Sequence, residues 1–148
     1  EGSEGMIKDI YALAKKTGCE IHLPTDVVLD DEQSLSIDRL SDQNQFSIFD
    51  LSNHSIKVLE QLVQKSEIVL WNGPMGMIED PRFAKGSSTL AHLLAKSSCD
   101  VVIGGGDTLL AINIAGVSFD HYHFVSTAGG AFLEALEDKE LPGIIALQ

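Results

Sequence analysis

Three times in the second half of this chain, a short apolar run leads directly into a glycine-bearing loop and then into a helical pattern. The apolar runs cover residues 68–71, 101–103 and 123–125, and each is too short to form a helix of its own. Strands that alternate with helices predict a parallel sheet with helices on both faces. All strand-to-helix loops of such a sheet lie at its carboxyl edge, so we expect the three glycine loops to converge there.

The first half of the chain is less regular. We expect helices over residues 6–17 and 56–63, strands over 19–24, 26–29 and 46–49, and a polar excursion with marginal strands over 30–45. The first helix ends at Gly18, and Ser52 or Asn53 is the N-cap of the second. The chain starts with Glu1 and enters a helical pattern almost at once, so we expect it to be a piece of a longer protein and an incomplete domain.

Charge and composition exclude several classes of partner. The 148 residues carry 10 Lys and Arg against 22 Asp and Glu, a net charge of −12, which disfavours nucleic acid and anionic lipid as partners. No apolar run approaches the ~20 residues of a membrane-spanning helix. Cys19 and Cys99 form no disulfide framework, so we expect a cytoplasmic protein. From the charge and the short apolar runs we expect neither a nucleic-acid nor a membrane partner.

The glycine loops at 104–106 and 129–130 precede helix starts, where unpaired N–H groups and the positive dipole end attract phosphate. Asp107 would repel a phosphate unless a cation lay between them, which points to Mg²⁺, a hard ion that prefers oxygen ligands. The alternative for Asp107 is that it only caps its helix. For the glycines, the alternative is a packing role.

The loop over 72–79 differs in kind, because it joins Asn72, Gly73 and Pro74 to an apolar stretch and to Glu79. Such a loop suits the face of a base and the hydroxyls of a ribose, with Glu79 as acceptor. A rigid turn whose Met and Ile pack into the core is the alternative. Neither a G-x-x-x-x-G-K-[ST] nor a G-x-G-x-x-G phosphate motif occurs.

Two other groups of residues resemble metal ligands only weakly. His121 and His123 would share a strand face, but without a third ligand we expect a structural role for them. Residues 30–32 are interpreted as a solvated acidic turn rather than a calcium site.

The motifs at 69–79, 83–86 and 102–108, and the ending at 126–143, are similar to phosphoglycerate kinase in order and spacing. Residues 21–26 also resemble the passage that precedes these motifs in the family. The chain departs from the family at Ala128, where a glycine is usual, and at Phe132, where a serine is usual. It also lacks the family's Gly-Pro at positions 52–53. A left-handed conformation at Ala128 would cost roughly 1–2 kcal/mol.

The resemblance implies that residues 1–148 are the carboxyl-terminal part of a Rossmann-like, three-layer α/β nucleotide-binding domain, with the amino-terminal substrate domain absent. It implies Mg²⁺ with ADP or ATP as cofactor and Asp107 as the metal contact. The remaining nucleotide contacts are Asn72, Gly73, Pro74, Glu79 (to the ribose), Gly104, Gly105, Gly106 and Thr108, and the catalytic amides are Gly129 and Gly130.

The parent would be a cytoplasmic, monomeric glycolytic kinase that transfers a phosphoryl group between 1,3-bisphosphoglycerate and ADP, giving 3-phosphoglycerate and ATP. These triose substrates would bind through the absent domain, so we expect the isolated chain to be inactive and to bind ATP poorly. Two alternatives stay open. One is a non-catalytic nucleotide- or phosphate-binding module (a degenerate paralogue), and the other is a structural or partner-binding domain.

Overall fold

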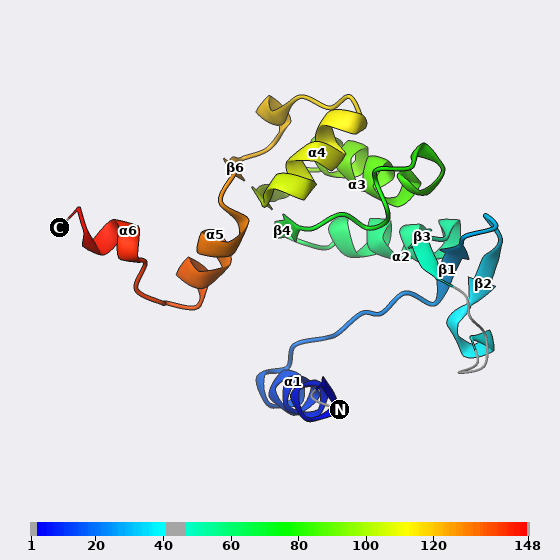
Figure 1. The fold of residues 1–148 in the computed structure, drawn as a ribbon, viewed down its shortest axis with the longest axis horizontal. Helices are drawn as coiled ribbons and strands as arrows, with labels where there is room; N and C mark the ends of the chain where they lie inside the picture. Colours follow the sequence, from blue (N-terminus) through cyan, green and yellow to red (C-terminus); the bar gives the residue numbers. More distant parts are fainter. Residues whose placement is uncertain (1–2, 41–46, 148) are drawn as a thin grey trace.

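The computed structural model describes residues 3–40 and 47–147 (Figure 1). Its helices and strands are, in chain order, α1 Ser3–Thr17, β1 Asp26–Leu29, β2 Ser34–Ser36, β3 Ile48–Leu51, α2 Asn53–Val63, β4 Ile68–Asn72, α3 Lys85–Lys96, β5 Asp100–Gly104, α4 Gly106–Ile114, β6 Phe124–Ser126, α5 Gly129–Leu136 and α6 Pro142–Ile145. Three 3-10 turns cover Ile37–Arg39, Pro81–Phe83 and Phe119–His121. No helix within the described ranges is long and apolar enough to cross a membrane.

The predicted parallel sheet is present, with the strand order β4-β5-β6. Trp71 of β4 pairs with Ile103 of β5, and these two side chains belong to the core that α3 and α4 cover. On the opposite face, the Phe132 ring of α5 lies against Gly104 and stacks on Phe124 with centroids 6.5 Å apart. Helices therefore contact both faces of the sheet, as the sequence predicts.

The main core lies between this sheet and the two helices α3 and α4. Leu94 of α3, Ile103 of β5 and Ile112 of α4 are fully buried in it. Burying each such side chain contributes about 1.5–3 kcal/mol. The Tyr122 hydroxyl donates to the carbonyl of Ala91 at 3.0 Å, so the polar end of this buried ring is also satisfied.

A second sheet, antiparallel and in the order β2-β1-β3, was not foreseen as a separate unit. Val27 of β1 pairs with Leu35 of β2 and with Leu51 of β3. The expected strand at 46–49 begins two residues later, at Ile48, and Phe46 lies outside the described residues. The polar excursion contains β2 and one 3-10 turn, and its positions 41–45 also lie outside the described residues.

The strand expected over 19–24 is wrong, because these residues form an extended segment without strand pairing. A strand needs a neighbour for its N–H and C=O groups, and none of the described strands adjoins this segment. Figure 1 shows α1 joined to the rest of the chain only through it. Most of the apolar stripe of α1 is therefore exposed, with Leu13 60% accessible and Ala14 the one buried residue of the helix.

Helix α2 begins where the sequence predicts, although the family's Gly-Pro turn is missing. Ser52 is its N-cap, and the Ser52 hydroxyl accepts from the N–H groups of His54 at 3.2 Å and Ser55 at 3.4 Å. A serine cap supplies the acceptor that the first helical turn needs. The lost Gly-Pro therefore does not prevent the helix from starting at Asn53.

Candidate functional site

The three glycine loops converge on one cavity at the carboxyl edge of the parallel sheet, as the strand–loop–helix pattern predicts. The cavity has a volume of about 340 Å³. Its lining residues are Asn72, Gly73, Gly105, Gly106, Asp107, Thr108, Gly129, Gly130 and Leu133. Eight of these nine are residues that the sequence singles out, and Leu133 of α5 is the addition.

Two of the glycines are required by the backbone conformation or by contact between the loops. Gly105 has a φ of +93°, and a Cβ there would stand 2.7 Å from Oδ1 of Asn72. A Cβ at Gly129 would stand 2.8 Å from the Cα of Gly105. A side chain at Gly105 would be strained by the positive φ, and a side chain at Gly129 would collide with the Gly105 backbone, so these two glycines are explained without a ligand.

Two further glycines, Gly106 and Gly130, are not explained by packing. A Cβ at Gly106 or Gly130 would meet nothing within 4 Å, and neither residue has a positive φ. Each lies in the first turn of a helix, α4 and α5 respectively, where glycine is a poorer helix former than alanine by about 1 kcal/mol. What glycine provides at both positions is open access to the backbone N–H groups of a helix start.

Thr108 links the first two loops through its hydroxyl. The side chain is completely buried, accepts from the N–H of Gly73 at 2.7 Å and donates to the carbonyl of Gly104 at 2.7 Å. The indole Nε1 of Trp71 donates to the carbonyl of Gly73 at 2.6 Å, so both the N–H and the C=O of Gly73 are hydrogen-bonded to side chains. The Thr108 hydroxyl is thus engaged with backbone groups, and a phosphate contact by Thr108 remains a prediction.

Asp107 is exposed in the first turn of α4 and lines the cavity. The N-cap of this helix is Gly105, with no side-chain capping bond, so the structure does not support the alternative that Asp107 is the cap. No cluster of three or more His, Cys, Asp and Glu suited to a metal occurs in the parts of the chain that the structure describes. Mg²⁺ is commonly held by one or two carboxylates together with substrate phosphates, and one carboxylate at this edge fits that pattern.

The two histidines near β6 do not share a strand face. His121 ends a 3-10 turn, while His123 lies just before β6 with its Nε2 3.0 Å from Oδ1 of Asp100. That expectation was wrong because the strand begins at Phe124, one residue beyond His123.

Some residues of the loop over 72–79 line cavities or are exposed, and others are buried in the core. Ile78 is buried in the core, as the rigid-turn alternative expected, whereas Glu79 is exposed and lines neither cavity described here. Pro74, Met75 and the next two residues face β3 across a second, mainly apolar cavity of about 590 Å³. A polar and an apolar cavity therefore flank the same loop.

The start of α5 shows how the chain accommodates Ala128. Its φ is −94°, an ordinary value for alanine, so the substitution carries no left-handed strain. The Ala128 N–H donates to the Ser126 hydroxyl at 3.3 Å, which leaves Gly129 and Gly130 as the residues whose amides begin the helix at the cavity. The expected cost at this position does not arise.

Sequence reasoning missed Asp50 as part of this region. Asp50 of β3 is buried, and its carboxylate accepts from the N–H groups of Gly86 at 2.9 Å and Leu51 at 2.8 Å. Burial raises the pKa of the Asp50 carboxyl, and hydrogen bonds from the backbone of Gly86, Leu51 and Lys85 oppose this rise. A single Asp at the end of a strand pattern offers no signal of this role, because Gly86 lies 36 positions further along the chain.

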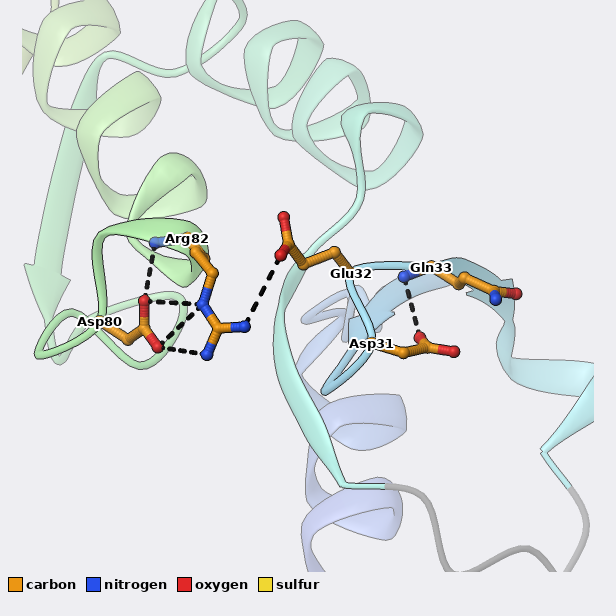
Figure 2. Close-up of polar contacts among 5 residues, drawn as sticks. All are labelled: Asp31, Glu32, Gln33, Asp80 and Arg82. Atoms are coloured by element: carbon orange, nitrogen blue, oxygen red, sulfur yellow. Dashed lines mark hydrogen bonds and ion pairs between the residues drawn. The ribbon is translucent and has the colours of Figure 1, made fainter.

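An arginine ties the segment after the loop to the antiparallel sheet (Figure 2). Arg82 binds both oxygens of Asp80, at 2.7 Å for the closest pair, and lies 3.6 Å from Glu32 in the β1–β2 turn. The Arg82 hydrogen bonds hold the pKa of Asp80 below its usual value. Asp31 accepts from the N–H of Gln33 at 3.0 Å, and the three acidic residues 30–32 are all exposed, so this segment is a surface turn.

Comparison with known proteins agrees with the motif resemblance. The family model described as phosphoglycerate kinase matches residues 2–139. The phosphoglycerate kinase of Zymomonas mobilis subsp. mobilis is 41% identical over 153 residues, covering 96% of this chain and 38% of the relative, and that of Nostoc sp. is 40% identical over 152 residues, covering 96% and 37%.

Solved structures give the same picture. The structure of phosphoglycerate kinase from Coxiella burnetii matches with a TM-score of 0.86 and 34% identity, covering 100% of this chain and 40% of that one. The phosphoglycerate kinase from Pyrococcus horikoshii OT3 matches with a TM-score of 0.74 and 27% identity, covering 99% and 39%. The chain thus spans well under half the length of the relatives it matches.

Proposed function

Because the chain belongs to the phosphoglycerate kinase family, we propose that it contributes the Mg-nucleotide side of a glycolytic kinase. The parent enzyme would transfer a phosphoryl group between 1,3-bisphosphoglycerate and ADP, giving 3-phosphoglycerate and ATP. The observation that carries this proposal is the convergence of three glycine loops, two helix starts and one carboxylate on a single cavity. Phosphoryl transfer asks a protein mainly for positioning and charge stabilisation, which such a cavity offers.

The phosphates would lie against the first turns of α4 and α5. Gly106 and Gly130 leave the N–H groups of these turns open, and the positive dipole ends of both helices favour negative charge. Mg²⁺, when bound, would neutralise phosphate charge, with Asp107 as its carboxylate contact. Thr108 would keep the first loop in register with the second through its bonds to Gly73 and Gly104.

The base and ribose would lie beside the other side of the first loop. The apolar cavity between Pro74, Met75 and β3 suits the flat face of a base. Asn72 and Gly73 would stand at the junction between base and phosphates, since both line the polar cavity. Glu79 is exposed at the end of this loop, where it would accept from a ribose hydroxyl.

The chain alone is proposed to bind nucleotide weakly and to lack activity. No Lys or Arg is among the residues that line the polar cavity, and the net charge of −12 opposes an anionic ligand. The triose substrate would reach the nucleotide from residues outside this chain. The parent is proposed to be a cytoplasmic monomer.

A non-catalytic nucleotide- or phosphate-binding module is the second candidate. Phe132 favours it, because its ring packs against Gly104 where the family usually carries serine. Both candidates need the polar cavity to bind phosphate. They differ in whether phosphoryl transfer follows.

Titration of Mg-ADP into the full-length protein tests the proposal, with Asp107→Asn as the variant. Asp9→Asn on the exposed surface of α1 is the matched control, since it removes the same charge far from the loops. We expect binding to weaken about tenfold or more with Asp107→Asn and to stay unchanged with Asp9→Asn. Equal binding by both variants refutes the metal role of Asp107, and a coupled assay for ATP formation then separates the kinase from the binding module.

A further inference from the structure

We propose that Asp50 is a positioning residue, whose buried carboxylate locks the loop over 74–77 between strand β3 and the start of helix α3. The inference deepens the proposed function, on which it rests, because this loop separates the polar cavity from the apolar one. Asp50 itself would touch neither the nucleotide phosphates nor the metal. Its action would pass through the backbone of the loop.

Asp50 first supplies the acceptor that α3 lacks. The N-cap residue of this helix is Ala84, which makes no side-chain capping bond. Asp50 reaches across from β3, and its Oδ2 accepts from the N–H of Gly86 in the first turn at 2.9 Å. A carboxylate at a helix N-terminus interacts favourably with the dipole as well as with the unpaired N–H groups. A side chain from a distant strand thus performs the capping.

The same carboxylate is in close contact with the loop at Gly76 and with the helix at Gly86. A Cβ at Gly76 would stand 2.5 Å from Oδ1 of Asp50 and 2.5 Å from the carbonyl oxygen of Phe83. A Cβ at Gly86 would also collide with Oδ1 of Asp50. Glycine at both positions lets the carboxylate lie between the loop and the helix, so loop, strand and helix share one contact point.

Two backbone N–H groups, one on either side of Gly76, also bind the loop to its neighbours. The N–H of Met77 donates to the carbonyl of Phe49 on β3 at 2.8 Å, and the N–H of Met75 donates to the hydroxyl of Ser87 on α3 at 2.9 Å. The loop is therefore hydrogen-bonded to β3 and to α3, the two elements that Asp50 joins. Any separation of β3 from α3 would move Met75 and Met77, which line the apolar cavity.

The geometry also specifies which side chain can serve. Oδ1 accepts from Leu51 and Oδ2 from Gly86, so both oxygens are needed as acceptors. Asparagine keeps one acceptor and directs an NH₂ group at the other N–H donor. Glutamate is one methylene longer, and that extra group would have to enter the space beside Gly76.

The test compares Asp50→Asn with Ser55→Ala in the present chain. Ser55 is a matched control, because its buried hydroxyl also makes two bonds to the backbone: it donates to the carbonyl of Asp26 at 2.7 Å and accepts from the N–H of Asp26 at 3.1 Å. Both bonds go to β1 and neither goes to the loop over 74–77. Trp71 is the single tryptophan, and its indole donates to Gly73 at the base of the loop, so its emission reports on loop position.

We expect Asp50→Asn to shift the Trp71 emission of the folded chain and to increase its quenching by acrylamide, while Ser55→Ala changes neither. In the full-length protein, Asp50→Asn should weaken Mg-ADP binding about tenfold and Ser55→Ala should leave it unchanged. Emission and binding that are the same in Asp50→Asn as in the control overturn the proposal.

Amide hydrogen exchange of the unmodified chain keeps the test decisive even if Asp50→Asn does not fold. First-turn helix amides ordinarily lack a partner and exchange rapidly. We expect the Gly86 amide to be protected at least tenfold relative to the amide of Asp107, which lies in the first turn of α4, a helix whose N-cap makes no side-chain bond. Rapid exchange at Gly86 overturns the proposal. If no variant and not even the unmodified full-length protein binds Mg-ADP, the proposed function fails, whereas the emission and exchange results still decide whether Asp50 holds the loop.

Discussion

Replacing Thr108 by valine tests the link between the first two glycine loops. Valine has nearly the same shape, so the substitution removes the hydroxyl and leaves the fully buried packing of the side chain in place. Two hydrogen bonds disappear, the one from the Gly73 N–H and the one to the Gly104 carbonyl, both 2.7 Å long. The methyl group that replaces the hydroxyl cannot accept or donate.

The structure sets the size of the effect. Each lost hydrogen bond is worth about 1 kcal/mol net, so the two together predict a loss of about 2 kcal/mol in the free energy of unfolding. Gly73 is only half-buried, so water can reach its N–H in part and the larger penalty for a fully buried orphan donor does not apply. Thr108→Ser is the control, because it keeps the hydroxyl and removes one buried methyl, at a cost of about 1 kcal/mol.

Urea unfolding followed by Trp71 fluorescence measures both variants. Valine should be the more destabilising of the two, and it alone should change the emission of the folded state, because Gly73 also accepts from the Trp71 indole. If valine destabilises the chain no more than serine does, the hydroxyl does not join the loops and the reasoning is refuted.

Two further predictions concern pH and association. Burial raises the pKa of Tyr122 to about 12, above its unfolded value of about 10, so its contribution to stability is complete below pH 10 and is lost as pH rises through 12. The tyrosinate absorbance should therefore include a step near pH 12 that Tyr122→Phe removes, and complete ionisation by pH 10.5 would contradict this. Leu70 and Phe124 on one face of the parallel sheet are 43% and 55% exposed, so we expect marginal stability and concentration-dependent association, which Leu70→Lys should reduce in size-exclusion chromatography. A sharp thermal transition from a clean monomer is the result that would count against it.

The regular second half of the fold could be predicted because its signals are local. Short apolar runs, glycine loops and helical patterns follow one another within about 25 residues, and the rules for parallel sheets then place all three loops at one edge. The segment over 19–24 has an equally good strand pattern and yet pairs with nothing in the described structure. Pairing depends on a neighbouring strand, and no local pattern supplies one.

The candidate site shows the same division. The strand–loop–helix pattern predicts that the loops of Asn72, Asp107 and Gly129 converge, since each loop follows a strand, and all three residues line the cavity. Asp50 was not identified, because its role depends on β3 passing beside the start of α3. The resemblance implies that Thr108 meets the nucleotide phosphates, which stays a prediction, and only the structure shows that its hydroxyl bonds to Gly73 and Gly104.

By itself, the amino-acid order determined the family, the succession of elements in the second half and the edge of the sheet where the loops gather, since these follow from periodicity and from motifs read along the backbone. Only the tertiary structure decided which glycines are needed for close approach, which polar side chains hold the loops, and which apolar surfaces are left open. Those features depend on distances between segments tens of residues apart, and such distances follow from packing rather than from neighbours in the chain.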